Sequence, residues 1–268
     1  MTTESTSERV FWWATSKPFT PPLAEFPSST DVAVIGGGYT GIAAARELAS
    51  RGASVSVLER GRLGAGASTR NAGMTIAGLK DSPAVLMKRH GEETGRQLFE
   101  TSLAANRYVE QLIERERIDC DYNRHGHVLA AWKDRDFHAM EREAEFLESK
   151  LSYKTRLLSA SDMAEELGSP LYRGAMIDEH SGGLHPARYF HGLTQSASRA
   201  GALLFSDTEV KEVQRSSDGF RLQTTRGPLK AREVLVATGF PVELSQRRRS
   251  LGVTRFGVED LLVERRGA

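Results

Sequence analysis

The sequence predicts an α/β fold in which a parallel-sheet domain is interrupted by a second region of mixed structure. Residues 32–60 contain an apolar run, a glycine-rich turn, an amphipathic stretch and a second apolar run, which is the order of a strand–helix–strand unit. Residues 81–185 break this order with a long helical pattern and scattered strand patterns, and from residue 186 a helix and several strands resume. Two interleaved domains explain this order better than two domains in tandem.

Bulk properties are those of an ordinary globular chain and exclude several classes of partner. The formal net charge of the 268 residues is +1, so no overall field attracts nucleic acid or an anionic membrane. No apolar run approaches the roughly 18 residues of a membrane span, and the first residues lack a signal-peptide pattern. The lone Cys120 excludes an internal disulfide and suits a reducing compartment. We therefore expect a cytoplasmic protein without a nucleic-acid or membrane partner.

The remaining elements follow from proline content, periodicity and turn residues. Residues 14–29 hold four prolines and predict an extended arm, with Trp12 and Trp13 before it as a packed anchor or, alternatively, a partner surface. Residues 82 to about 117 repeat with a helical period, and Pro186 suits the start of a helix that runs through Arg199. The other expected elements are a strand at 127–132, a helix at 134–150, strands at 202–207, 208–215, 220–225 and 232–239, and turns at 217–219 and 227–228.

A glycine-rich turn joins the first strand to the first helix. The apolar run 31–35 suits a strand buried on both faces, and it leads into GGGYTG. Gly36 makes the tight turn, Gly38 lets a pyrophosphate approach the backbone, and Gly41 lets the helix lie close to the strand. The free N–H groups and the positive dipole end of that helix would face the phosphates. Its expected buried stripe is Ile42, Ala45, Leu48 and Ala49, before a stop at Gly52.

An acidic residue ends the second strand, expected at 53–58. Glu59 stands eighteen residues after Gly41, where a carboxylate can accept both hydroxyls of an adenosine ribose. A bare glycine pattern is a weak signal, but strand, turn, helix, glycine stop, strand and acid stand here in order. We therefore predict a Rossmann-like dinucleotide-binding domain, with a glycine-rich structural turn as the alternative.

The stretch after Glu59 bears on which dinucleotide is bound. Arg60 is followed by LGAGASTRNAG, in which Ser68, Arg70 and Asn71 stand among small residues. Backbone amides, a hydroxyl and a positive charge suit a second phosphate. On composition alone, however, a flexible loop is the better interpretation.

Taken in order, the motifs resemble the D-amino-acid oxidase superfamily of FAD enzymes, and most closely its glycine oxidase and gamma-glutamylputrescine oxidoreductase branch. The residues that carry the resemblance are GGGYTG from Gly36, LER from Leu58, GASTRNAG from Gly66, Gly78-Leu79-Lys80, Ile118-Asp119-Cys120-Asp121, Ser181 through Tyr189, and Val236-Ala237-Thr238-Gly239. They cover residues 10 to about 240 and are far more specific than the glycine turn alone.

The resemblance implies an FAD extended across the first domain. It places Gly36, Gly38 and Gly41 at the pyrophosphate, Glu59 at the adenosine ribose, Ser68, Arg70 and Asn71 along the pyrophosphate-to-flavin stretch, the backbone of Val210 at the adenine, and Ala237, Thr238 and Gly239 beside the cofactor. Their sequence neighbours Tyr39, Thr40, Arg60, Ala72 and Gly73 are also assigned to cofactor binding. Some relatives bond a histidine covalently to the flavin near the position of Arg70. This sequence has no histidine there, so the expected binding is non-covalent.

The resemblance also implies a reaction. A hydride passes from the carbon beside the nitrogen of an amine or amino acid to flavin N5, the imine product hydrolyses, and oxygen or another acceptor reoxidises the flavin. Relatives continue past the ATG strand to complete the substrate sheet, whereas residues 241–268 show no second glycine-rich segment. We expect a truncated or frame-shifted relative, or a non-catalytic FAD-binding remnant that needs a partner. An NAD(P)-dependent enzyme is a third hypothesis, which the GASTRNAG loop and the ATG strand disfavour.

No catalytic residue is assigned from the sequence. His185 is the best polar candidate, although a structural role between strand and helix is favoured, and a metal site at His125 and His127 is disfavoured. Arg247-Arg248-Arg249 is read as a solvated surface rather than a nucleic-acid site. The expected domains are an arm at 1–29, an FAD-binding domain at 30–80 and 186–240, a partial substrate region at 81–185 and an atypical tail at 241–268.

Overall fold

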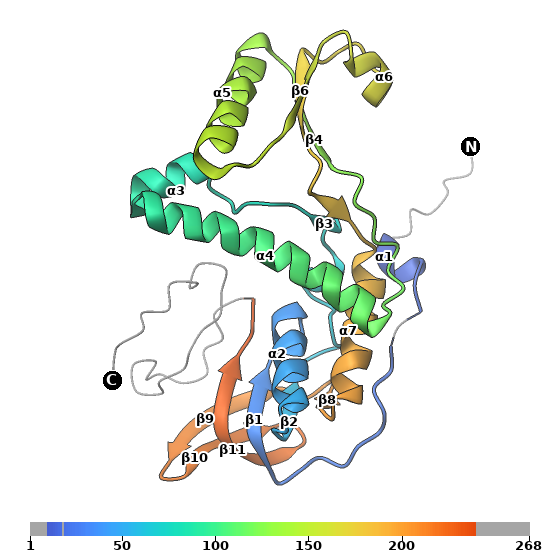
Figure 1. Cartoon of the computed structure of the whole chain (residues 1–268). Helices are drawn as coiled ribbons and strands as arrows, with labels where there is room; N and C mark the ends of the chain where they lie inside the picture. Colours follow the sequence, from blue (N-terminus) through green and yellow to red (C-terminus); the bar gives the residue numbers. More distant parts are fainter. Residues whose placement is uncertain (1–9, 18, 240–268) are drawn as a thin grey trace, which may run out of the picture. The chain divides into compact units, whose positions relative to one another are not determined.

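The computed structural model describes residues 10–17 and 19–239, which form two compact units (Figure 1). The first unit runs to Ala72, includes Ile118–Cys120 and resumes at Pro186. The second comprises Gly73–Arg117 and Asp121–His185. The predicted α/β class with a parallel sheet is confirmed. Residues 241–268, including the arginine run, and residues 1–9 of the arm lie outside the described part of the chain.

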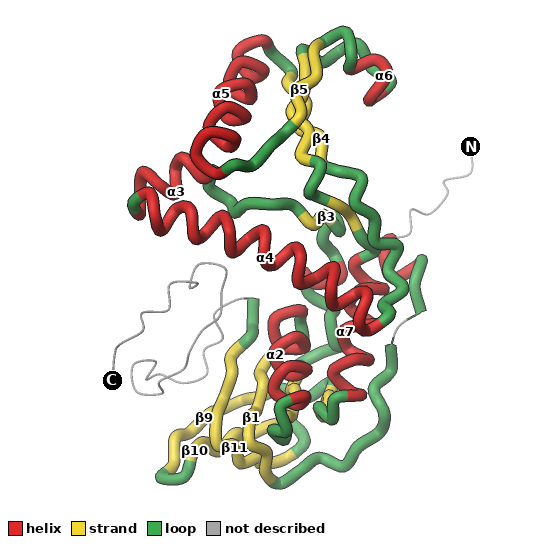
Figure 2. Tube along the Cα trace, in the orientation of Figure 1, coloured by secondary structure: helices red, strands yellow, loops and turns green. Residues whose placement is uncertain are grey.

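The first unit is built on a six-stranded sheet with strand order β8-β2-β1-β11-β10-β9. Strands β8, β2, β1 and β11 are parallel neighbours, and β11, β10 and β9 follow as an antiparallel meander. Figure 2 shows β9, β10 and β11 in yellow near β1. The elements of this unit are α1 (Phe11–Ala14), β1 (Ser29–Ile35), α2 (Tyr39–Ser50), β2 (Val55–Leu58), the 3-10 turn η1 (Ala67–Thr69), α7 (Pro186–Arg199), β8 (Leu203–Phe205), β9 (Val210–Ser216), β10 (Gly219–Thr224) and β11 (Gly227–Val236).

One apolar cluster joins the parallel strands to the meander. Ala33 and Ile35 of β1 and Leu58 of β2 pack with side chains of β9, β10 and β11, such as Val213 and Leu222. All four residues of β2 are buried, as expected for a strand covered on both faces. Helix α2 packs on β2 and on α7. The last residues of β1 and β2, Ile35 and Leu58, therefore belong to the core.

Two details of the first unit correct the sequence-based expectations. On α2 the buried stripe includes Arg46, whose Nε donates to the buried Ser196 Oγ at 2.8 Å, whereas Leu48 is only half-buried. The second turn precedes Gly227, because Gly227 and Pro228 already belong to β11. Proline is tolerated there because β11 pairs only with β10 at Pro228, while its pairing with β1 begins at Lys230.

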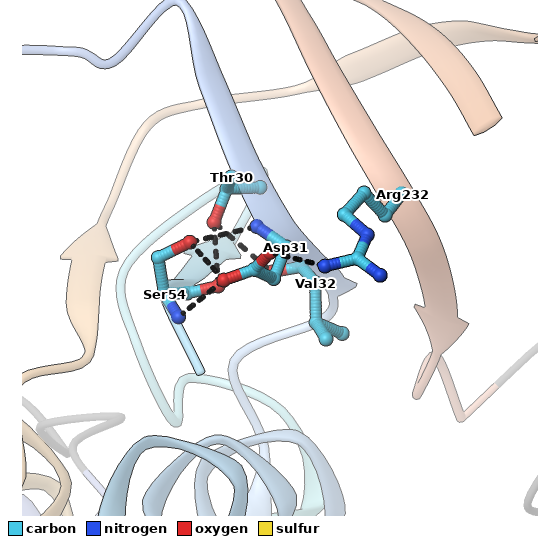
Figure 3. A network of polar contacts seen from close by, with 5 residues as sticks. All are labelled: Thr30, Asp31, Val32, Ser54 and Arg232. Atoms are coloured by element: carbon cyan, nitrogen blue, oxygen red, sulfur yellow. Dashed lines mark hydrogen bonds and ion pairs between the residues drawn. The ribbon is translucent and has the colours of Figure 1, made fainter. Parts of the chain in front are cut away.

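A polar network ties the start of β1 to the loop before β2 and to β11 (Figure 3). Asp31 Oδ2 accepts from the backbone N and the Oγ of Ser54 at 2.9 and 2.7 Å, and Asp31 Oδ1 lies 3.2 Å from a guanidinium nitrogen of Arg232. The hydrogen bonds from Ser54, followed by the one from Arg232, hold the pKa of the Asp31 carboxyl below its ordinary value.

The second unit contains a three-stranded antiparallel sheet, a two-stranded sheet and four helices among its described residues. The three-stranded sheet has the order β4-β6-β5, and its cluster of Leu158, Met163, Ala175 and Ile177 is separate from a second cluster around Phe99. The elements of this unit are β3 (Met74–Thr75), α3 (Pro83–His90), α4 (Glu92–Glu116), β4 (His127–Ala131), α5 (Asp134–Leu151), β5 (Arg156–Ser159), α6 (Met163–Leu167), β6 (Gly174–Asp178) and β7 (Gly182–Gly183).

The long helical region breaks once, at Gly91. Its φ of +90° is a left-handed conformation that favours glycine, and its N–H closes α3 by donating to the carbonyl of Met87 at 2.9 Å. Helix α4 begins at the next residue. Among the described residues, no helix is both long and apolar enough to cross a bilayer.

Candidate functional site

The glycine turn between β1 and α2 is shaped by close backbone contacts. Gly36 has a φ of +110°, and a Cβ added there would lie 2.6 Å from the carbonyl oxygen of Ala237. A Cβ added to Gly41 would lie 2.0 Å from the carbonyl oxygen of Gly36. These two glycines are therefore required by the fold, because the turn, the helix and the segment after β11 leave no room for a side chain.

Gly38 differs from both, because an added Cβ would meet no backbone atom of another segment within 4 Å. It is the N-cap of α2 with an extended backbone, and the nearest atom to an added Cβ is Ser68 Oγ at 3.0 Å. The first N–H of α2, from Tyr39, donates to the same Ser68 Oγ at 3.0 Å. Helix N–H groups at a helix start lack intrahelical acceptors and attract anions. The turn therefore provides an uncrowded position for a phosphate.

Glu59 lies at the carboxyl end of β2, beside the turn. Its Oε2 accepts from the N–H of Gly37 at 2.8 Å and its Oε1 accepts from the N–H of Gly61 at 3.0 Å. Each carboxylate oxygen keeps a second lone pair for another donor. The half-buried Glu59 is thus held in position by the backbone, while the neighbouring Arg60 is exposed.

The segment 67–73 contacts the glycine turn through Ser68, near the start of the segment. Asn71 Nδ2 donates to the carbonyl oxygens of Ala67 and Ser68 at 3.1 and 3.0 Å, which closes the 3-10 turn. The Arg70 guanidinium lies 4.8 Å from the centre of the Trp13 ring. Ala72 is exposed, and Gly73 belongs to the second unit. The predicted anchoring of the tryptophans is confirmed, since both indoles donate to this segment.

Tyr39 contributes its backbone rather than its phenol to the turn. The Tyr39 hydroxyl donates to the carbonyl oxygen of Pro186 at 3.0 Å, and its ring packs on Tyr189 and Phe190. Burial raises the pKa of this phenol well above its ordinary value. The next residue, Thr40, is exposed.

The strand ends complete the same edge of the sheet. The N–H of Ala237 donates to the carbonyl of Ile35 at 2.8 Å, so residues 237–239 continue from β11 beside Gly36. Before β9, the N–H of Thr208 donates to the carbonyl of Glu59 at 2.8 Å. Val210 begins β9 with its side chain buried in the core cluster, which leaves its backbone as the group available to a ligand.

Sequence reasoning missed Thr69 and Gly64. Thr69 is 2% exposed, and its hydroxyl accepts from Trp13 Nε1 at 2.7 Å and donates to the carbonyl of Gly64 at 2.7 Å. No local signal identifies these residues, because Trp13 and Thr69 are 56 positions apart. Among the described residues, no group of three or more His, Cys, Asp or Glu is placed to hold a metal ion.

Comparisons with known proteins show the family of this chain. Residues 31–256 match the profile of the family described as FAD dependent oxidoreductase. The chain is 32% identical over 225 residues to the gamma-glutamylputrescine oxidoreductase of Escherichia coli, covering 82% of this chain and 52% of that protein. It is 30% identical over 239 residues to a probable oxidoreductase, OrdL, of Haemophilus influenzae, covering 88% and 54%.

A solved structure of a relative has a similar fold over most of this chain. The crystal structure of glycine oxidase from Geobacillus kaustophilus aligns with a TM-score of 0.66 at 28% identity, over 80% of this chain and 56% of that one. The chain thus spans about half the length of the relatives it matches. The resemblance inferred from the motifs is confirmed, and this chain belongs to the D-amino-acid oxidase family of FAD-dependent oxidoreductases.

Proposed function

We propose that the first unit binds FAD non-covalently and that the chain serves the oxidation of the CH–NH bond of a small amine or amino acid. The observation that carries the cofactor assignment is the convergence of three groups on one edge of the sheet. These are the glycine turn at Gly38, the Glu59 carboxylate and the Ser68 hydroxyl of η1. The carboxylate accepts from the N–H of Gly37 in the turn, and the hydroxyl accepts from the N–H of Tyr39, the residue after Gly38.

Each group suits a different part of a dinucleotide. The Ser68 hydroxyl, which accepts from the N–H of Tyr39, and the N–H groups that follow in the first turn of α2 would donate to the pyrophosphate. The spare lone pairs of Glu59 would accept from the ribose hydroxyls. The remaining residues that we assign to the cofactor are Gly36, Tyr39, Thr40, Gly41, Arg60, Arg70, Asn71, Ala72, Gly73, Val210, Ala237, Thr238 and Gly239.

Non-covalent attachment is supported by the absence of reactive partners in the relevant places. Position 70 is arginine, not histidine, and the lone Cys120 is 1% exposed. If bound in this way, the flavin would accept the hydride from the carbon beside the substrate nitrogen, and oxygen or another acceptor would take the electrons. The chain's own residues would hold and orient the dinucleotide.

A second candidate function follows from chain length. Because the chain spans about half the length of its relatives, it is alternatively a flavin-binding chain that does not oxidise an amine by itself. The two functions share the cofactor site and differ in whether bound flavin is reduced by substrate.

The visible absorption spectrum of the purified chain, reconstituted with FAD, tests both. We expect a bound-flavin band, released by acid precipitation if the attachment is non-covalent. Bleaching under anaerobic conditions with glycine or gamma-glutamylputrescine, the substrates named by the relatives, supports oxidation. A stable band that no amine bleaches favours the second candidate. A colourless chain that binds NAD instead would overturn the cofactor assignment.

A further inference from the structure

The N-terminal arm reaches the segment that we assign to the pyrophosphate. Helix α1 presents two adjacent indoles to it. Trp12 Nε1 donates to the carbonyl oxygen of Asn71 at 2.8 Å, and Trp13 Nε1 donates to Thr69 Oγ1 at 2.7 Å. The arm is therefore bonded to the turn that carries Ser68, although about fifty-five residues separate the two in sequence.

The bond from Trp13 continues inward to the glycine turn. Thr69 is buried, and its hydroxyl donates to the carbonyl oxygen of Gly64 at 2.7 Å. The N–H of Gly64 in turn donates to the carbonyl oxygen of Gly37 at 2.9 Å. A continuous series of hydrogen bonds thus runs from the Trp13 indole through Thr69 and Gly64 to the middle of the glycine turn.

The Trp13 ring also orients a charge. The guanidinium carbons of Arg62 and Arg70 lie 4.0 and 4.8 Å from the ring centre, within the range of a cation–π interaction. Arg70 is one of the residues that we assign to the cofactor. The indole therefore acts on both sides of Ser68: through Thr69 on the backbone of the turn, and through its face on the Arg70 side chain.

We infer that Trp13 and Thr69 are positioning residues for the pyrophosphate of FAD, an inference that rests on the proposed cofactor site. They would not touch the cofactor. They hold the Ser68 hydroxyl against the first N–H of α2, from which it accepts a hydrogen bond, so that the hydroxyl is in place to donate to a diphosphate before the diphosphate binds. Preorganised donors bind more tightly because the ordering is not paid for on association.

Glu59 offers an internal reference for this inference. It is held at the end of β2 by its own bonds to the N–H groups of Gly37 and Gly61. The ribose side of the site thus has a separate support. Loosening the Ser68 turn should weaken binding of ligands that carry a diphosphate far more than binding of adenosine.

The test compares Trp13→Phe, Thr69→Val and the double variant in the full chain. Phe keeps an aromatic ring for the two arginines and for the pocket that Trp13 and Thr69 line with Leu63 and Phe190, but removes the N–H donor. Val is close in size to Thr and removes the hydroxyl. Trp132→Phe in the second unit, where the indole is 58% exposed, is the matched control.

Dissociation constants are measured for FAD by flavin fluorescence, and for ADP and adenosine by ligand-observed NMR. We expect Trp13→Phe to weaken FAD and ADP binding by about tenfold, the cost of one lost hydrogen bond, and Thr69→Val to weaken it at least as much, because it also removes the bond to Gly64. Adenosine should change by less than about twofold, because its support is separate. The double variant should resemble Thr69→Val alone, since both substitutions remove the same bond. The control should match the wild type.

Two results would overturn the inference while leaving the proposed function intact. One is an unchanged affinity for FAD and ADP in both variants. The other is an equal loss for all three ligands, which would mean a general structural role. A wild-type chain that binds neither FAD nor ADP would refute the proposed function and the inference together. Thermal melting of the apo-protein shows whether Thr69→Val folds. If it does not fold, the affinities of Trp13→Phe for the three ligands decide between these outcomes.

Discussion

A Cβ atom meets a different neighbour at each glycine of the turn. At Gly36 and Gly41 it meets backbone oxygens, at 2.6 and 2.0 Å, which cannot move without opening the turn. At Gly38 it meets only the hydroxyl of Ser68, at 3.0 Å. The fold alone thus explains Gly36 and Gly41, whereas at Gly38 the proposed pyrophosphate would approach the backbone.

Gly38→Val should therefore separate folding from cofactor binding. Its backbone, with φ −91° and ψ −172°, is one that valine adopts, so we expect the variant to fold. The branched side chain would occupy the space in front of the α2 N-terminus and block the pyrophosphate, weakening FAD by at least about a hundredfold. Flavin content after gel filtration measures this. Gly66→Ala, where an added Cβ meets nothing within 4 Å, is the control. Unchanged flavin content in Gly38→Val would refute the placement.

At the scale of elements, the crossing of α3 and α4 depends on one residue. Helix propensity alone predicts that Gly95→Ala in α4 stabilises the helix by about 1 kcal/mol. However, an added Cβ would lie 2.6 Å from the backbone N and 2.7 Å from the Cα of Met87 in α3. Overpacking against a backbone typically costs about 1–3 kcal/mol.

We therefore expect Gly95→Ala to lower the free energy of unfolding by up to about 2 kcal/mol, because the clash exceeds the gain in propensity. Urea denaturation followed by circular dichroism measures this. Glu100→Ala, at an exposed position of the same helix, should change stability by less than about 0.5 kcal/mol. A more stable Gly95→Ala variant would show that α3 moves away without cost.

The Asp31 network gives the first sheet a dependence on pH. Because the pKa of Asp31 is lower in the folded chain than its ordinary 3.8, its contribution to stability is present above that value and is lost as pH falls through the folded pKa. The stability difference between the wild type and Asp31→Asn should therefore be larger at about pH 6 than at about pH 3. Urea unfolding at both pH values measures it. A difference independent of pH would mean that the ionised carboxylate is not what Ser54 and Arg232 stabilise.

At the scale of the whole molecule, the two units have separate apolar clusters and separate sheets. A ligand stabilises the part of a protein that must be folded to bind it. The proposed site for the adenosine diphosphate portion lies within the first unit, on β1, α2 and β2.

We expect ADP at about ten times its dissociation constant to slow hydrogen exchange about tenfold for amides of β1, β2 and α2 that exchange through opening of the site. Amides of β4, β5 and β6 should exchange at their unliganded rate. Mass spectrometry of exchanged peptides, with and without ADP, measures both. Equal protection in the second sheet would show that the two units open together.

Local features of the fold were predictable because they depend on neighbouring residues. Pro186 as a first helical residue predicted α7 with its observed ends, and the strand–turn–helix order placed β1, α2 and β2. The break at Gly91 and the inclusion of Pro228 in β11 were not predicted, because each depends on which chain segment packs or pairs alongside.

By itself the sequence determined the α/β class, the glycine turn, the acid that ends β2 and, through its ordered motifs, the family. Only the tertiary structure decided which distant side chains support α2 and the turn before it: Arg46 of α2 bonds to Ser196, and Trp13 bonds to Thr69. The physical reason is the range of the interactions. Periodicity and turn chemistry act over a few residues, whereas these hydrogen bonds join side chains 150 and 56 positions apart, which only the packed fold brings together.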